Sequence, residues 1–114
     1  MQVEGSCHCG KISFRAEIDA GAVAICHCTD CQALSSTAFR ITAPAREGSF
    51  RLLTGAPKLY VKVTADSGAE RVQAFCGECG SAIYSTSPTG TNRTLGIRIG
   101  VLKQRSELAP SRQI

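Results

Sequence analysis

The seven cysteines of this chain lie in three tight clusters, with none in the long intervals between them. The clusters are Cys7-His8-Cys9, Cys26-His27-Cys28-Thr29-Asp30-Cys31 and Cys76-Gly77-Glu78-Cys79. An odd number of cysteines argues against a disulfide framework, which uses cysteines in pairs. Thiolates two or three positions apart converge readily on one metal ion, so the spacing predicts metal binding. Zinc is the default metal for an all-thiolate site, and iron is the alternative.

Two other interpretations of the cysteines fit less well. A thioredoxin-like redox pair at Cys76 and Cys79 needs a βαβ context and a helix after the motif. Here the motif is followed by the turn-like Gly80-Ser81-Ala82 and the strand-like Ile83-Tyr84. The known ferredoxin spacings of iron–sulfur proteins are also absent. The sequence therefore favours zinc.

Seven ligands do not fill two four-thiolate sites, so we expect one site of four cysteines and one of three. The three-cysteine group would consist of Cys26, Cys28 and Cys31, which lie within six residues. The four-cysteine group would consist of Cys7, Cys9, Cys76 and Cys79. This partition is the most economical, although other pairings of the clusters remain open. A four-thiolate zinc is saturated and structural, whereas a three-thiolate zinc keeps a position for a ligand.

The alternative to an open three-cysteine site is that a histidine supplies the fourth ligand, since neutral imidazole is a good zinc ligand. Both His8 and His27 lie between ligand cysteines. In a short extended segment, alternate side chains point to opposite faces. We therefore expect His27 to point away from the ion that Cys26 and Cys28 hold.

The composition predicts one folded domain over residues 1–114 with a modest core. The chain is 43% hydrophobic but only 5% aromatic and has no tryptophan, so metal binding would help to hold it together. No apolar run approaches the ~20 residues of a membrane helix, so we expect no membrane partner. The first residues lack the basic-then-apolar layout of a signal peptide. We therefore expect a cytoplasmic protein.

Alternation of apolar and polar residues dominates the chain and predicts a mainly antiparallel β fold. The clearest strand is Lys11–Ile18, where Ile12, Phe14, Ala16 and Ile18 would share one face. Further strands are expected at Val23–Cys26, Phe39–Thr42, Phe50–Leu53, Leu59–Val63, Arg71–Phe75, Ala82–Tyr84 and Leu95–Ile99. The only helical candidate is Cys31–Ser35. Asp66-Ser67-Gly68 is expected to form a hairpin tip, and the polar tail 103–114 is expected to be exposed.

The charge gives little support for nucleic-acid binding. Two zinc ions held by seven thiolates would contribute roughly −3, which reduces the formal charge of +4 to about +1. The basic residues are scattered instead of forming a stripe, and we expect most of them on solvated strand faces. They include Arg40, Arg46, Arg51, Lys58, Lys62, Arg71, Arg93, Arg98, Lys103 and Arg105. One or two of them are candidates to pair with carboxylates of a ligand.

Three motifs in this order carry a family resemblance. They are Gly5-Ser6-Cys7-His8-Cys9-Gly10, Cys26-His27-Cys28-Thr29-Asp30-Cys31 and Phe75-Cys76-Gly77-Glu78-Cys79-Gly80-Ser81. The set resembles the signatures of the glutathione-dependent formaldehyde-activating enzyme family, which also includes centromere protein V. The match continues through Gly55, Tyr60 and Gly100-Val101-Leu102, so it covers nearly the whole chain.

The resemblance implies a β-tent fold of antiparallel sheets around two zinc ions. It implies that the four-cysteine group holds a structural zinc and the three-cysteine group a second, exchangeable one. This is the partition reached above by counting ligands. The implied activity is condensation of glutathione with formaldehyde to S-(hydroxymethyl)glutathione, which is classed as a carbon–sulfur lyase reaction.

We therefore expect a zinc protein that binds glutathione or another small thiol and adds it to formaldehyde or a related small aldehyde. Zinc binding lowers the pKa of a thiol and makes it a better nucleophile. His27 is a candidate for proton transfer, although a solvated loop residue is the favoured interpretation. The alternative function is a noncatalytic, zinc-stabilised scaffold for protein–protein contact. A homodimer is left open by the sequence.

Overall fold

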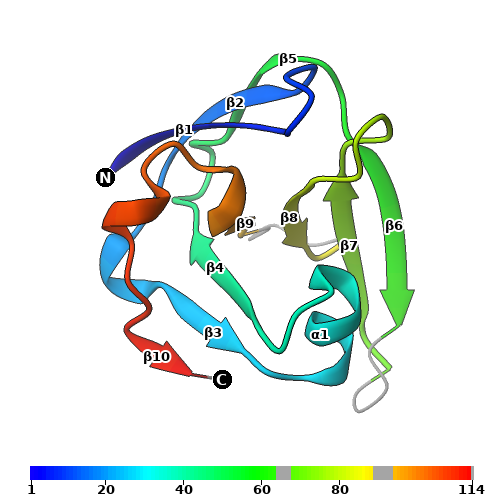
Figure 1. Ribbon diagram of the computed structural model, residues 1–114. Helices are drawn as coiled ribbons and strands as arrows, with labels where there is room; N and C mark the ends of the chain where they lie inside the picture. Colours follow the sequence, from blue (N-terminus) through cyan, green and yellow to red (C-terminus); the bar gives the residue numbers. More distant parts are fainter. Residues whose placement is uncertain (64–67, 89–93, 114) are drawn as a thin grey trace.

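Two β-sheets, a small antiparallel one and a large mixed one, form the computed structural model, which describes residues 1–63, 68–88 and 94–113. The three-stranded sheet has the order β1-β2-β5, and the seven-stranded sheet has the order β10-β3-β4-β9-β8-β7-β6. All strand pairs are antiparallel except β10 with β3. Figure 1 shows the large sheet curving around α1, so that β3 and β7 lie on opposite sides of the helix. The expected mainly β fold class is confirmed.

All eight strands expected from alternation are present. They are β2 (Ser13–Glu17), β3 (Ala24–Cys26), β4 (Arg40–Pro44), β5 (Arg51–Thr54), β6 (Lys58–Val63), β7 (Glu70–Phe75), β8 (Ala82–Thr86) and β9 (Gly96–Arg98). In β2, Phe14 and Ala16 are buried while Arg15 is exposed, as a half-buried strand requires. The expected hairpin tip at 66–68 lies largely outside the described residues.

Two strands were not expected from the sequence. They are β1 (Gln2–Ser6) and the short β10 (Arg112–Gln113). The described residues also form the 3-10 turns η1 (Ala20–Ala22), η2 (Ile99–Val101) and η3 (Arg105–Glu107). The expected helix is present as α1 (Thr29–Ser35).

The tail departs in part from the expectation of an exposed segment. Most of its described residues are exposed, but Leu108 is only 5% exposed and packs into the core. Ser111 donates its backbone N–H to the carbonyl of Val23, and β10 then pairs with β3. An apolar anchor and a few backbone hydrogen bonds therefore fasten this segment to the large sheet.

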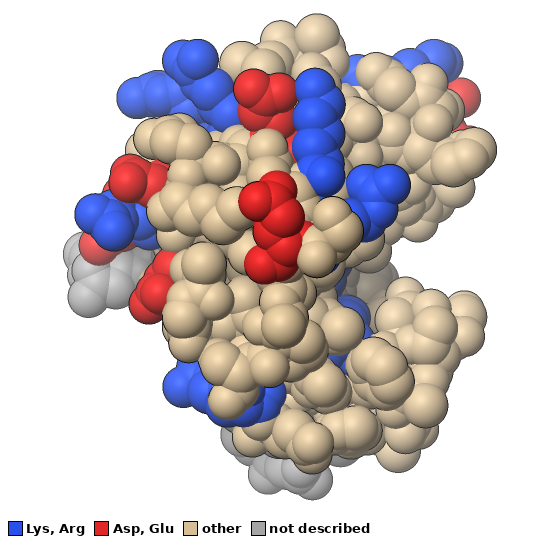
Figure 2. Space-filling model, turned by 60° about the vertical axis from the view of Figure 1, so that its left-hand side comes forward, with Lys and Arg blue, Asp and Glu red and all other residues tan. Residues whose placement is uncertain are grey.

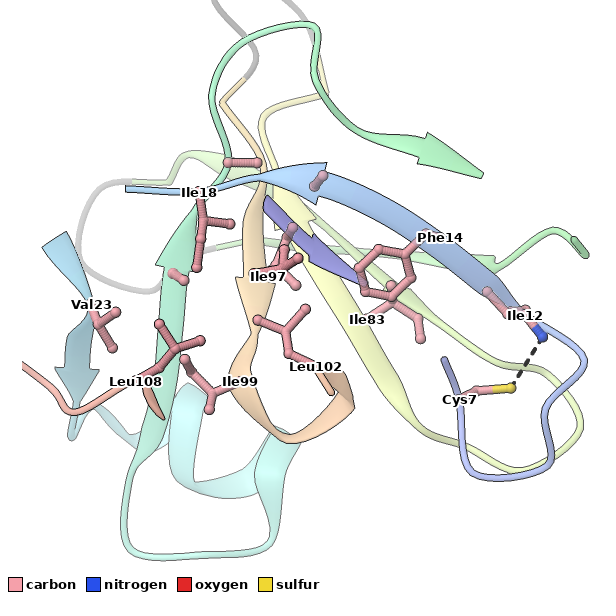
Figure 3. Close-up of a cluster of buried hydrophobic side chains, with 14 of the residues drawn as sticks. Cys7, Ile12, Phe14, Ile18, Val23, Ile83, Ile97, Ile99, Leu102 and Leu108 are labelled. Atoms are coloured by element: carbon pink, nitrogen blue, oxygen red, sulfur yellow. Dashed lines mark hydrogen bonds between the residues drawn. The ribbon is translucent and has the colours of Figure 1, made fainter. Parts of the chain in front are cut away.

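The core lies between the two sheets and draws on both of them. Figure 3 shows Phe14 of β2 and Ile18, which follows β2, in one cluster with Ile97 of β9 and Leu102. Two isolated bridges, Gly5 with Leu102 and Ile18 with Ala45, join the sheets by backbone contact. The core therefore holds the ends of β1 and β7, which carry the outer cysteine clusters, in fixed relation to one another.

Candidate metal centres

The four-cysteine group joins segments that are far apart in the sequence. Cys7 and Cys9 follow β1, and Cys76 and Cys79 lie in the turn between β7 and β8. The four Sγ atoms all lie within 4.8 Å of one another, with 3.6 Å between Cys7 and Cys9 and 3.8 Å between Cys9 and Cys76. A tetrahedral ion with Zn–S bonds of about 2.3 Å separates its sulfurs by about 3.8 Å. The group therefore fits a zinc ion.

Each half of this group is a tight turn that ends in glycine. The backbone N–H of Gly10 donates to the carbonyl of Cys7 over 3.1 Å, and that of Gly80 donates to the carbonyl of Cys76 over 2.8 Å. Gly10 and Gly80 have φ angles of +82° and +80°, which lie in the left-handed region. Glycine adopts this conformation without steric cost, so it follows the second cysteine in both turns.

Hydrogen bonds to sulfur favour the thiolates of Cys7 and Cys79 in this group. The backbone N–H of Ile12 donates to Cys7 Sγ over 3.2 Å at the edge of the core (Figure 3). Ser81 Oγ lies 3.2 Å from Cys79 Sγ and accepts the backbone N–H of His8. The Ser81 hydroxyl lowers the pKa of Cys79 to about 5. Because the thiolate is the metal-binding form, these contacts prepare the group for an ion.

The three-cysteine group is built around the start of α1. Cys26 ends β3, Cys28 is the N-cap of α1, and Cys31 lies in its first turn. Their Sγ atoms lie within 4.8 Å of one another, with 3.4 Å between those of Cys26 and Cys28. This group is placed to hold one ion with three ligands, which would leave a fourth position for another ligand.

Opposing effects act on the thiols of this group. The backbone N–H of Cys31 donates to Cys28 Sγ over 3.4 Å, and this hydrogen bond lowers the pKa of Cys28. Burial raises the pKa of Cys31 to about 12. This raised pKa disfavours the Cys31 thiolate, and a divalent cation bound by the group would favour it.

The histidines stand apart from the sulfur atoms. His8 and His27 are both exposed, and the ring of His27 lies 5.8 Å from that of Phe39. Neither histidine belongs to a metal-binding group of the described residues. The structure thus brings together the same four and the same three cysteines that ligand counting indicated, without an imidazole.

The expectation of solvated basic residues is wrong for several of them. Arg98 is only 7% exposed, and Arg40, Lys62 and Arg71 are half-buried. Burial lowers the pKa of Arg98 to about 9, and the charge of Arg40 acts in the same direction. Arg93 lies outside the described residues. Sequence reasoning missed this set because strand register, and not sequence distance, brings its members together.

The remaining surface charges match the expectation better. Figure 2 shows acidic and basic side chains interspersed over one face, without a broad basic stripe. The described ion pairs are Lys11 with Glu78, Lys62 with Asp30, and Lys103 with Glu4. The Lys62–Asp30 pair, at 2.7 Å, ties the edge strand β6 to α1 beside the three-cysteine group.

The family model described as glutathione-dependent formaldehyde-activating enzyme matches residues 2–114 of this chain. The chain belongs to this family. The match covers nearly the whole chain and includes all seven cysteines of the two groups.

Two relatives extend this result. A protein of Schizosaccharomyces pombe, named as an uncharacterized lyase, is 29% identical over 91 residues, which cover 80% of this family member. That alignment spans 62% of the length of the S. pombe protein. A crystal structure of a Rhodobacter sphaeroides protein matches with a TM-score of 0.74 and 21% identity, over 97% of this chain and 99% of that one. This second likeness shows the fold alone.

None of the described helices has the length and apolar character needed to cross a membrane.

Proposed function

We propose that this protein binds a small thiol, such as glutathione, at the three-cysteine group and adds it to formaldehyde or a related aldehyde. Family membership and the lyase name of the relative support this class of reaction. The observation that carries the proposal is the convergence of Cys26, Cys28 and Cys31 without a fourth protein ligand in their group. The proposed ions are zinc, one in each cysteine group.

The residues of the site would hold and orient the thiol. Cys26, Cys28 and Cys31 would hold a zinc ion, which would supply a fourth position for a small thiol and lower the pKa of that thiol. Cys28 is positioned by the Cys31 N–H, and Lys62 lies close enough to lower the pKa of Cys28. His27, beside Phe39 at the surface, stays a candidate for proton transfer to the carbonyl oxygen.

The proposed reaction balances without an oxidant or reductant. The sulfur attacks the aldehyde carbon, and a carbon–sulfur bond forms while the carbonyl π bond opens. The thiol loses its proton, and the former carbonyl oxygen gains one to become a hydroxyl group. Because the catalysed step needs only a thiolate and a proton donor, few residues suffice. A reducing compartment such as the cytoplasm suits the proposal, since all seven cysteines are free thiols.

Calorimetric titration of the zinc-loaded protein with glutathione tests thiol binding directly. We expect binding heat from the wild-type protein and its loss in Cys31→Ser, which removes one ligand of the open site. A matched control is Ser106→Ala at the exposed 3-10 turn η3, which leaves both cysteine groups unchanged. Absence of heat and of zinc displacement at millimolar glutathione would reject the proposal.

A second candidate function, the noncatalytic scaffold for protein contact, is favoured by the edge strand β6. Leu59, Tyr60, Val61 and Val63 are between 48% and 64% exposed, and β6 ends the order of the large sheet. Exposed apolar edge strands tend to pair with other chains. A homodimer through two β6 edges is the simplest form of this candidate.

Sedimentation analysis tests the scaffold candidate. We expect Val61→Lys to weaken any self-association of the protein, because it places a charge on the exposed apolar edge. Lys58→Arg, on the same strand, is the matched control that preserves charge. A wild-type protein that sediments as a monomer at all concentrations, with thiol binding intact, would leave only the enzymatic proposal standing.

A further inference from the structure

One face of the large sheet gathers arginines next to the three-cysteine group. In the β3–β4 register Arg40 lies opposite Cys26, and in the β4–β9 register Arg98 lies opposite Thr42. Directly opposed residues of an antiparallel pair have side chains on the same face. Residues 40 and 42 also share a face, because side chains alternate along a strand. Cys26, Arg40, Thr42 and Arg98 therefore line one continuous surface.

The two guanidinium groups share one neutral acceptor. Arg98 donates to Gln73 Oε1 over 3.0 Å and to Thr42 Oγ1 over 2.6 Å. Arg40 donates to the same Gln73 Oε1 over 3.3 Å, and its Nε is buried without a hydrogen-bond partner. Buried guanidinium groups are normally paired with carboxylates. Here the amide oxygen of Gln73, and not a carboxylate, accepts hydrogen bonds from both arginines.

The charge around this pair does not balance within the chain. None of the described ion pairs includes Arg40 or Arg98. The nearby negative charges are the thiolates of Cys26 and Cys31, which interact electrostatically with Arg98. Arg71 also acts on Arg98, so three guanidinium groups carry three positive charges, whereas a divalent ion with three protein thiolates and one bound thiolate carries two negative charges. One positive charge is left over, and a monoanion would neutralise it.

A cavity gives a ligand access to these arginines. Arg40 and Arg98 line a space of about 590 Å³ between α1 and the β7–β8 turn, together with Leu34, Phe39 and Ser81. An adjoining hollow of about 320 Å³ shares both arginines and adds Tyr60 and Gln73. Spaces of this size accept small organic molecules, and apolar walls with a few polar groups are typical of ligand sites.

We propose that Arg40 and Arg98, held together by Gln73, form a carboxylate-binding subsite beside the three-cysteine group. The inference rests on the proposed thiol binding and narrows it to thiols that carry a carboxylate. The carboxylate would occupy the cavity at the two arginines, while the sulfur lies at the three-cysteine group, whose Cys26 is paired with Arg40 between β3 and β4. The pairing of a guanidinium with a carboxylate is directional, so the subsite would also orient the thiol.

Two probes that differ only in charge test this subsite on the zinc-loaded protein. They are 3-mercaptopropionate and its neutral amide, 3-mercaptopropionamide, titrated calorimetrically under the same conditions. We expect the acid to bind at least about tenfold more tightly, as is typical of a hydrogen bond to a charged group. Equal affinities for the acid and the amide would overturn the subsite and leave thiol binding intact.

Substitution of Arg40 tests whether this residue causes the tighter binding of the acid. Arg40→Gln removes one charge from the half-buried member of the pair, and we expect it to abolish the preference for the acid. Arg40→Lys keeps the charge and is expected to retain part of the preference, which shows that the fold has survived. Arg51→Gln, at an exposed position of β5, is the control and should leave the preference unchanged. If Arg40→Gln keeps both zinc ions and the full preference for the acid, the subsite is disproved.

A thiol-free probe separates this proposal from the proposed function. Propionate carries the carboxylate but no sulfur, and we expect it to shift the Arg40 Nε–H resonance in ¹⁵N NMR spectra of the wild-type protein. A shift with propionate, combined with no binding of either thiol, would support the subsite and reject thiol binding. If propionate causes no shift and the acid has no advantage over the amide, the subsite is disproved.

Discussion

Ser81 supports the four-cysteine group through both its side chain and its backbone. Its hydroxyl lies 3.2 Å from Cys79 Sγ, and its carbonyl accepts the N–H of Cys76 over 2.9 Å. The hydroxyl holds the pKa of Cys79 near 5, far below the ordinary thiol value of 9.0. The stabilisation from this lowered pKa is complete above pH 9 and is lost as the pH falls toward 5.

We therefore expect Ser81→Ala to release metal at a higher pH than the wild-type protein. Without the hydroxyl, the pKa of Cys79 is higher, so protons displace the ion from this thiolate at a higher pH. The midpoint should rise by a fraction of a pH unit, because one of four ligands is affected. Acid titration with a colorimetric zinc chelator measures it, with Ser106→Ala as the control. An unchanged midpoint in Ser81→Ala would show that the hydroxyl does not act on Cys79.

At the scale of elements, α1 ends in a conformation that its sequence does not favour. Ser36, the C-cap, has a φ of 56° and a ψ of 32°, in the left-handed region. A residue with a side chain pays a steric penalty in this conformation, which glycine avoids. The helix that carries Cys31 thus ends on a locally strained residue.

Replacement of Ser36 by glycine should stabilise the fold. We expect Ser36→Gly to raise the free energy of unfolding by about 0.5–1 kcal/mol, because relief of the left-handed strain outweighs the added freedom of the unfolded chain. Urea denaturation measures this change. Ser106→Gly, at a position with no positive φ, should instead destabilise the protein. A loss of stability in both variants would contradict the strain assigned to Ser36.

Most elements were predictable because they follow simple alternation, and β1 shows why one was not. The segment Gln2–Ser6 contains only one large apolar residue, Val3, so it lacks an alternating pattern. Its place in the sheet comes from pairing with β2, where Gly5 lies opposite Phe14. A Cβ at Gly5 would lie 2.3 Å from Phe14 Cζ, so the ring of Phe14 fills the space that a side chain would take. This information belongs to the pair of strands and not to β1 alone.

The two cysteine groups differ in their place in the whole molecule. The four-cysteine group joins the turn after β1 to the turn after β7, and so connects the small sheet to the large one. The three-cysteine group lies within one short segment at the start of α1. Loss of an ion should therefore have global consequences at the first group and local ones at the second.

Substitution of one cysteine in each group tests this difference. We expect Cys76→Ser to prevent folding, because structural zinc sites contribute on the order of 10–16 kcal/mol in small zinc domains. Cys31→Ser should keep the fold, unfold cooperatively and contain one zinc ion in place of two. Circular dichroism and elemental analysis measure both properties. Equal collapse of the two variants would overturn the division into a structural and an exchangeable ion.

The two cysteine groups were predictable from the sequence, whereas the arginine pair was not. Cysteine clusters are visible because ligands within each cluster are close in sequence and few other roles produce such spacing. Arg40, Gln73 and Arg98 lie on β4, β7 and β9, and only the order of strands in the large sheet brings them together. Each of them alone looks like an ordinary polar residue of a strand.

The uneven sequence span of the two cysteine groups has a consequence during synthesis on the ribosome. Cys26, Cys28 and Cys31 emerge together, so a nascent chain has all three ligands of one ion while most strands are still unmade. Cys7 and Cys9 must wait for Cys76 and Cys79, by which point the strands up to β7 have been translated. The four-cysteine group can therefore form only after all three strands of the small sheet, and β3, β4, β6 and β7 of the large sheet, have been made.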